Sequence, residues 1–218
     1  MTESIVKRVI SVIRRHGLVL FLISLGFDES PVVAQQDASL GRAYLHPETE
    51  LIGWGNNAFG QLSIPPELRH VVSLAVGGNH VIALKSDGTV QVWGETFPET
   101  LQLPDGLSNV VAVTAGFSHS VALRSGGALV IWGNNSQGEL DVPADVGILT
   151  QVSAFGCHTL GLRPDGTVVA WGCNSHGQLE IPDGLRGVVS VAAGTTHSVA
   201  LRSDGTVVAW GGNFFGQS

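Results

Sequence analysis

Charged side chains are scarce in this sequence, and basic ones are the scarcest. Only 13% of its 218 residues are Asp, Glu, Lys or Arg, against about 25% in an average soluble domain. The formal net charge of −7 excludes the broad basic surface that nucleic-acid binding requires. Low charge combined with 44% hydrophobic residues also excludes a disordered polyampholyte. We therefore expect a folded chain with no nucleic-acid partner.

Long hydrophobic runs are missing as well. The one extended apolar stretch, residues 17–27, is too short to cross roughly 30 Å of hydrocarbon as a helix. It follows a basic segment at residues 7–15 and precedes a small-residue site at 32–34, an order typical of an export signal. We expect residues 1–34 to be a signal peptide, and the mature protein to be secreted or periplasmic without membrane contact. A buried N-terminal helix or an uncleaved anchor is the alternative.

Glycine is abundant instead, with 29 residues, and three other residue types recur with one period. Tryptophan, histidine and proline each return every 39 residues. The recurring residues are Trp54, Trp93, Trp132, Trp171 and Trp210; His80, His119, His158 and His197; and Pro65, Pro104, Pro143 and Pro182. A period of about 20–50 residues is typical of solenoids, propellers and repeat arrays.

One repeat unit reads as a small antiparallel sheet. Apolar or alternating segments occupy residues 188–193, 197–202 and 206–210, and a Ser-Asp-Gly turn separates the last two. Residues 177–182 read as a short fourth strand, whose closing proline suits a sheet edge. Four short strands per unit predict an all-β fold: a β-propeller of four-stranded blades over residues 40–218.

The turn sequence also predicts which residues face each other. A three-residue loop centred on Asp165 places Trp171 opposite Thr159. The same rule places Trp132 opposite Ser120 and Trp210 opposite Ser198. Small partners leave room for an indole, so we interpret the tryptophans as packing wedges between blades. A stacking platform for sugars is the alternative.

The only two cysteines fall at one predicted cross-strand contact, where Cys157 lies opposite Cys173. In an exported protein this arrangement favours a disulfide, with two free thiols as the alternative. Because no second cysteine pair exists, a structural zinc site is not expected. We expect no metal and no cofactor.

The four repeated histidines admit two interpretations. A symmetric array of imidazoles could bind a metal or an anion. Blade symmetry would hold the four rings far apart, however, and a histidine at a strand start commonly bonds backbone of its own blade. We therefore interpret these residues as structural. No recurring carboxylate accompanies histidine and serine, so the sequence predicts no catalytic residue and no enzyme.

The motifs WGNNAFGQL at 54–62, WGCNSHGQL at 171–179 and VAAGTTHSVALRSDGTVVAWG at 191–211 resemble the regulator of chromosome condensation repeat family. The resemblance covers residues 40–218 and implies a propeller that usually has seven blades. Exported bacterial members, the β-lactamase inhibitory proteins among them, look most similar. Residues 95–101 lack the shared pattern, and about 4.6 units are present. We expect a truncated product; self-association that completes the ring and an open array are the alternatives.

Aromatic residues mark a candidate binding surface. The loops after the first and third strands of each unit should share one face, and these loops hold every phenylalanine beyond residue 34. The predicted binding residues are Phe59, Phe97, Phe117, Phe155, Phe214, Phe215 and His176. Binding to an unidentified protein is the functional interpretation; capping of the blade ends is the alternative. Competing functions are an exported inhibitor resembling the β-lactamase inhibitory proteins or, without export, guanine-nucleotide exchange on a small GTPase.

Overall fold

The computed structural model describes residues 51, 53, 55–94 and 102–218. The predicted signal peptide, Trp54 and Phe97 therefore lie outside the described residues. These residues form twelve β-strands and no helix. The described part of the chain therefore contains no helix that is long and apolar enough to cross a membrane. The strands are β1 Val71–Val76, β2 His80–Lys85, β3 Val90–Gly94, β4 Val110–Ala115, β5 His119–Arg124, β6 Leu129–Gly133, β7 Gln151–Phe155, β8 His158–Leu162, β9 Val168–Gly172, β10 Val188–Ala193, β11 His197–Arg202 and β12 Val207–Gly211.

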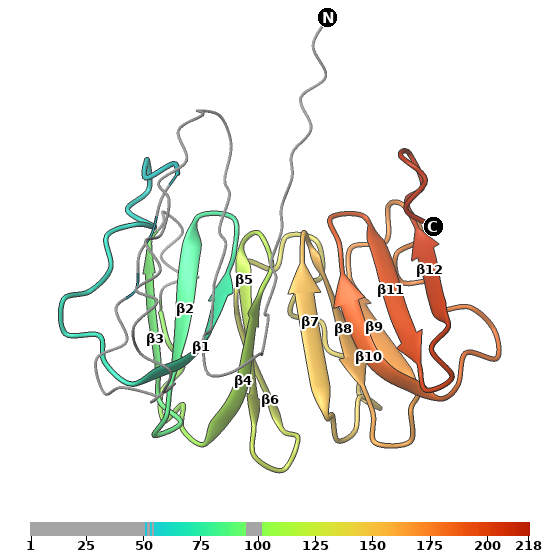
Figure 1. Ribbon diagram of the computed structural model, residues 1–218, viewed down its shortest axis with the longest axis horizontal. Helices are drawn as coiled ribbons and strands as arrows, with labels where there is room; N and C mark the ends of the chain where they lie inside the picture. The colour runs from blue at the N-terminus through green and yellow to red at the C-terminus, as the bar shows by residue number, and fades with distance from the viewer. Residues whose placement is uncertain (1–50, 52, 54, 95–101) are drawn as a thin grey trace, which may run out of the picture.

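Four antiparallel sheets stand side by side in chain order, with orders β1-β2-β3, β4-β5-β6, β7-β8-β9 and β10-β11-β12 (Figure 1). Their first strands β1, β4, β7 and β10 contact one another in succession. Each sheet is one blade, and we number the blades one to four. The predicted all-β propeller-type architecture is confirmed.

The predicted fourth strand of each blade is wrong for the described residues, where every sheet has three strands. Residues 177–182 instead form consecutive turns, in which Glu180 N donates to Gly177 O at 3.0 Å and Ile181 N to Leu179 O at 2.9 Å. Gly177 has a φ of +77°, which breaks the extended backbone. Because these amides bond locally, they are not available for a sheet ladder.

The predicted strand register is confirmed. Trp171 pairs with Thr159, Trp132 with Ser120 and Trp210 with Ser198. The turns behind this register hold glycine at positive φ, as at Gly205 (+85°). The Asp204 carboxylate accepts hydrogen bonds from Thr206 N at 2.9 Å and Thr206 Oγ1 at 2.6 Å, which closes the loop locally.

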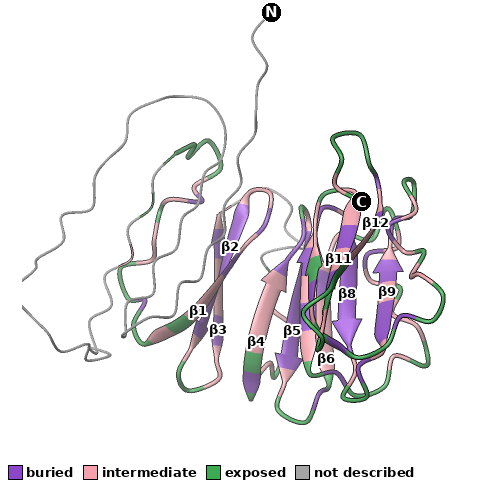
Figure 2. Cartoon of the chain, turned by 45° about the vertical axis from the view of Figure 1, so that its right-hand side comes forward, coloured by how far each residue is buried: buried purple, intermediate pink, exposed green. Residues whose placement is uncertain are grey.

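The hydrophobic core lies between the blades, and tryptophan fills it as predicted. Trp132 of blade two packs in one cluster with Leu84 and Val90 of blade one. Trp210 of blade four packs likewise with Leu162 and Val168 of blade three. The middle strands of blades one, two and three are the most buried, as β5 and β8 show in Figure 2. Each blade therefore depends on its neighbour to cover one face.

The repeated histidines bond a different partner from the one expected. His80 Nε2 lies 3.0 Å from Ser120 Oγ, and His158 Nε2 lies 3.0 Å from Ser198 Oγ. His119 makes the same contact with Thr159 Oγ1. Each imidazole thus reaches a side chain of the next blade, where we expected backbone of its own blade. We call these three contacts the histidine bridges.

Burial keeps the bridging histidines neutral. Desolvation lowers the pKa of His80, His119 and His158 from 6.5 to about 4. Ser198 Oγ donates to Gln178 O at 2.8 Å, so the proton in its bridge belongs to His158 Nε2. His158 Nδ1 is buried without a hydrogen-bond partner. A second proton there would therefore add a buried donor without an acceptor.

Candidate binding face formed by the blade loops

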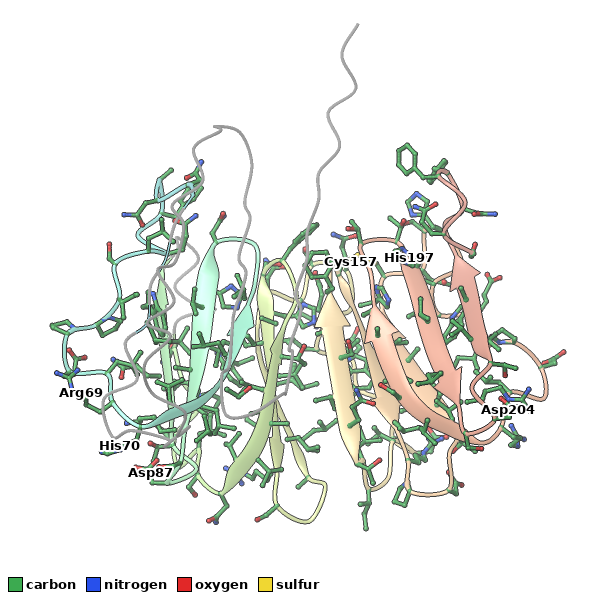
Figure 3. The ribbon with its side chains drawn as sticks, in the orientation of Figure 1. Arg69, His70, Asp87, Cys157, His197 and Asp204 are labelled. Atoms are coloured by element: carbon green, nitrogen blue, oxygen red, sulfur yellow. A yellow bond between two sulfur atoms is a disulfide. The ribbon has the colours of Figure 1, made fainter. Side chains whose placement is uncertain are left out.

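The two ends of each blade are built from different loops. Because the strands alternate in direction, the turns between first and second strands share one end with the loops that follow third strands. Figure 3 shows Cys157 and His197 near this end, whereas Asp87 and Asp204 lie at the opposite one. We call the first end the loop face. It comprises residues 56–60, 77–79, 116–118, 134–138, 156–157, 173–177, 194–196 and 212–216.

Every described phenylalanine that we predicted for this face lies there or directly at its edge. Phe59 is 44% exposed, Phe117 41%, Phe214 71% and Phe215 91%, while Phe155, the last residue of β7, is half-buried. Isolated exposed aromatics are common on protein surfaces, but four on one end of a fold are not. The exposure of four of the five leaves little support for the interpretation that they only cap the blades.

The aromatic side chains pair across neighbouring blades. The rings of Phe117 and Phe155 lie edge to face with centroids 5.4 Å apart. His176 and Phe214 form a similar pair, also at 5.4 Å. Phe117 N additionally donates to Gly156 O at 2.7 Å. Loops from separate blades therefore form a continuous surface.

A side-chain oxygen holds the backbone of four described loops of the kind that follows a third strand, from glutamine in three of them and from Glu139, which accepts from Gln137 N at 2.7 Å, in blade two. The Gln178 side-chain oxygen accepts a hydrogen bond from His176 N at 2.9 Å, and Asn174 Oδ1 accepts one from Leu179 N at 2.9 Å. Gln61 and Gln217 hold Phe59 N and Phe215 N in the same way, at 3.0 and 2.6 Å. Sequence reasoning missed this role, although Gln61, Gln178 and Gln217 are separated by multiples of 39 residues, which was the available signal.

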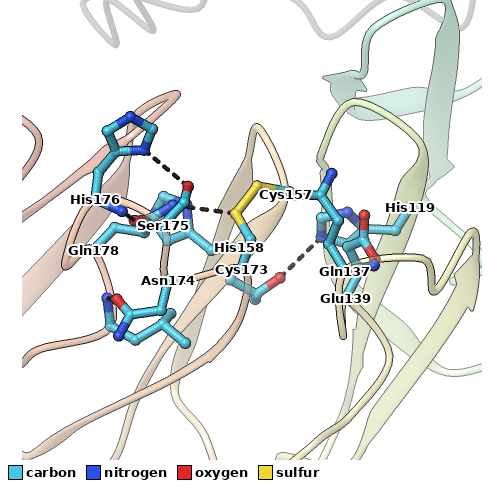
Figure 4. The surroundings of a disulfide bond; sticks show 12 residues. His119, Gln137, Glu139, Cys157, His158, Cys173, Asn174, Ser175, His176 and Gln178 are labelled. Carbon is cyan, nitrogen blue, oxygen red and sulfur yellow. Dashed lines mark hydrogen bonds between the residues drawn. A yellow bond between two sulfur atoms is a disulfide. The ribbon is translucent and has the colours of Figure 1, made fainter.

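A disulfide ties two loops of blade three together. Cys157 in the β7–β8 turn is bonded to Cys173 after β9, with Cα atoms 5.5 Å apart (Figure 4). Gln178 Nε2 donates to Cys173 Sγ at 3.1 Å. Cys173 N donates to Cys157 O at 3.0 Å, as Asn134 N does to Ser118 O in blade two at 2.8 Å. The covalent bond therefore reinforces a contact that the backbone already makes.

The described segments of the loop face contain no Asp, Glu, Lys or Arg. The described residues hold no group of three or more His, Cys, Asp or Glu side chains that could bind a metal. The imidazole–hydroxyl pairs of the histidine bridges are fully buried, so no substrate could reach them. The composition of the loop face therefore suits burial against an apolar surface.

The charged end is the one with the Asp-Gly turns. Hydrogen bonds from Thr89, Thr167 and Thr206 lower the pKa of the Asp87, Asp165 and Asp204 carboxyls below their ordinary value. These carboxylates are solvent-exposed and already bonded within their own turns. Their contacts are local and structural.

Comparison with solved structures gives similar folds in several proteins. Yeast RCC1 (Prp20), solved bound to Kap60, is 25% identical, with a TM-score of 0.57 over 66% of this chain and 44% of that protein. The ectodomain of the Physcomitrella patens receptor kinase CR4 is 24% identical, with a TM-score of 0.62 over 72% and 46%. Human WBSCR16 is 20% identical, with a TM-score of 0.58 over 68% and 50%. The chain thus spans half or less of each relative.

Comparison with sequence families completes the assignment. No curated protein sequence matches the chain. The model of the regulator of chromosome condensation (RCC1) repeat matches residues 71–95, 110–139, 150–178 and 188–217, which together exceed half of the chain. These matches coincide with the four blades. The chain therefore belongs to the regulator of chromosome condensation repeat family.

Proposed function

We propose that this protein is an exported, non-enzymatic interaction module that binds a protein partner through its loop face. The carrying observation is the group of exposed, pre-positioned aromatics at one uncharged end of the blades. Solved relatives of similar fold bind proteins: yeast RCC1 is complexed with Kap60, and Prp20p binds Gsp1p and histones. Those partners belong to the relatives; here they support protein binding as the class of function.

The energetics favour this surface. Burying a phenylalanine side chain contributes about 1.5–3 kcal/mol, and Phe214 and Phe215 are the most exposed hydrophobic residues described. Because side-chain amides already order their loop, binding costs little additional entropy. A face without formal charge predicts an affinity that depends only weakly on salt.

Export is supported by the disulfide, since such bonds persist in oxidising compartments. Sequencing the amino terminus of the protein released by its source cells tests this part of the proposal. We expect the mature chain to begin at Gln35. Recovery of the protein only inside the cytoplasm with Met1 or Thr2 at its start would overturn export.

Site-specific photocrosslinking tests the binding face. A benzophenone amino acid is placed at Phe215 or, as control, at Asp204 on the opposite end, and the protein is irradiated with its source cells' secretome. We expect a discrete adduct from position 215 that position 204 does not give. Adducts from 204 alone, or equally from both, would overturn the assignment of the face.

Purified components then test the energetics. The protein identified by crosslinking is titrated with wild type, with the F214S/F215S variant and with V72S, which removes an equally apolar, 51% exposed side chain from β1. We expect at least tenfold weaker binding for the first variant and no change for V72S. A β-lactamase as the crosslinked protein would establish the inhibitor function; a small GTPase would establish the exchange function.

A further inference from the structure

The disulfide of blade three lies at a corner that two other blades close without sulfur. In blade two, Asn134 N donates to Ser118 O at 2.8 Å, and in blade four Gly212 N donates to Thr196 O at the same distance. Blade three makes the equivalent backbone bond at 3.0 Å. Because the backbone alone closes this corner in blades two and four, we expect the folded protein to tolerate opening of the S–S bond.

The two sulfur atoms of this bond have different surroundings. Cys173 is only 7% exposed, whereas Cys157 is half-buried. Gln178 Nε2 donates to Cys173 Sγ at 3.1 Å (Figure 4), and no described side chain donates to Cys157 Sγ. A dissolved thiol therefore reaches Cys157 more easily, while the hydrogen-bond donor lies on Cys173.

This asymmetry gives thiol–disulfide exchange a direction. An attacking thiolate needs an accessible sulfur, and the reaction is faster when the departing sulfur is stabilised as a thiolate. A hydrogen bond from an amide N–H stabilises that negative charge. We propose that the Cys157–Cys173 disulfide is a thiol-exchange site, at which a small thiol or dithiol attacks Cys157 Sγ and Cys173 Sγ departs.

The exchange proceeds in two balanced steps. The incoming thiolate forms a new S–S bond to Cys157 Sγ, and the electron pair of the broken bond passes to Cys173 Sγ. A second reductant thiolate then attacks the reductant sulfur of this mixed disulfide, so that the reductant leaves as a disulfide. The protein gains two electrons, and its two cysteines take up the two protons that the reductant thiols lose.

Gln178 makes a second hydrogen bond that keeps its donor in place. Its side chain is fully buried, and its oxygen accepts from His176 N at 2.9 Å. Glu139 occupies the equivalent position in blade two and accepts from Gln137 N at 2.7 Å, but a carboxylate has no N–H to donate. A glutamate at this position therefore holds the loop without supplying a donor to sulfur, which makes Gln178→Glu a matched variant.

Mapping of the adduct tests the site in the folded protein. The full chain is treated at pH 8 with 2-mercaptoethanol, a neutral thiol, and sampled early. Free thiols are blocked with N-ethylmaleimide, and mass spectrometry locates both groups while circular dichroism verifies the fold. We expect the mixed disulfide on Cys157 and the maleimide on Cys173. A mixed disulfide on Cys173, equal amounts on both, or no reaction until urea unfolds the chain would overturn the proposal.

Variants test the contribution of the donor. We expect Gln178→Glu to slow the first exchange step at least about fivefold, because the departing thiolate loses its donor and meets a negative charge. Val111→Glu, at a 56% exposed position on β4 of blade two, adds the same charge and should leave the rate unchanged. An unchanged rate in Gln178→Glu, or an equal decrease in Val111→Glu, would contradict the role of Gln178.

The position of the adduct in the unaltered protein decides the proposal if Gln178→Glu does not fold. These measurements involve no partner protein, so their failure would leave the proposed function of the loop face untouched.

Discussion

The two ends of the blades share the same strands and differ in nearly everything else. The Asp-Gly end repeats one turn, in which an exposed carboxylate bonds a threonine two residues later. The loop end varies between blades and holds the exposed phenylalanines, the disulfide and, just inside it, the histidine bridges. Both ends join neighbouring blades, since Val110 N donates to Gly88 O at the Asp-Gly end and His80 Nε2 contacts Ser120 Oγ near the loop end. The comparison teaches that the Asp-Gly end joins blades through one repeated backbone turn, whereas the loop end presents variable side chains.

Acidification should have the largest effect on stability, and it should act on the histidine bridges near the loop end before it acts on the Asp-Gly turns. The bridging histidines have a pKa near 4 in the folded state against 6.5 unfolded, so their contribution is complete above pH 6.5 and is lost as pH falls toward 4. Each shift corresponds to about 3 kcal/mol. We expect the free energy of unfolding, measured with urea at pH 7, 5.5 and 4, to fall by several kcal/mol over this range.

The turn aspartates titrate in a lower range. Their folded pKa lies below 3.8, so their small, solvent-screened contribution is lost only as pH falls through that lowered value.

A variant of one bridge tests the assignment of the acid sensitivity. His119→Gln should reduce the slope of the unfolding free energy against pH between pH 6.5 and 4 by about a third. An unchanged slope in that variant would contradict the assignment of the acid sensitivity to the bridges.

The second-largest effect on stability is expected from glycine substitution, and it should differ between Gly172 at the loop end and Gly205 at the Asp-Gly end. Gly172 has a φ of +105°, and a Cβ there would overlap the Cys157 carbonyl oxygen. Gly205 has a φ of +85° with nothing within 4 Å of a Cβ. We expect Gly172→Ala to cost more than about 3 kcal/mol and Gly205→Ala only about 1 kcal/mol. Equal losses in denaturant titrations would contradict the overlap with the Cys157 carbonyl oxygen as the cause of the difference.

Removing the disulfide should have an intermediate effect. The bond closes a loop of 16 residues, for which chain entropy predicts about 3 kcal/mol. Because the backbone bond between Cys173 N and Cys157 O remains, we expect the double variant Cys157→Ser, Cys173→Ser to keep its fold by circular dichroism and to lose this stability in urea. Loss of the fold itself would show that the bond is required and not merely reinforcing.

The smallest effect is expected at an Asp-Gly turn. Asp204→Ala removes two local hydrogen bonds from an exposed carboxylate, so we expect only a small lowering of Tm in thermal unfolding and no change in partner crosslinking. A lowering as large as that caused by loss of the disulfide would contradict a purely local role of the carboxylate.

Most of the fold could be predicted from the 39-residue repeat period. Tryptophan spacing and the turn centred on Asp165 were sufficient to predict the strand pairing and the wedge between blades. The fourth strand could not be predicted reliably, because residues 177–182 alternate like a strand while Gly177 and local amide bonds turn the chain. A pattern of side chains does not show which groups accept the hydrogen bonds of the backbone amides.

The site was predicted in part. Loop positions predicted the phenylalanines at one end, but not the glutamine side chains that accept hydrogen bonds from the loop backbone. The bridges were missed because each histidine was expected to bond backbone of its own blade, whereas its partner lies 40 residues away in the next blade. Contacts between repeats follow from the stacking of blades, which no single unit reveals.

The histidine bridges give the array a direction, since blades one, two and three each place an imidazole against a hydroxyl group of the next blade. Among the described residues, unfolding of blade two or three breaks two such bridges, whereas unfolding of blade one or four breaks one. The stability of a blade then depends on how many bridges it makes, as in a one-dimensional chain of coupled elements. We expect β7–β9 to retain amide protection longer than β10–β12 on heating.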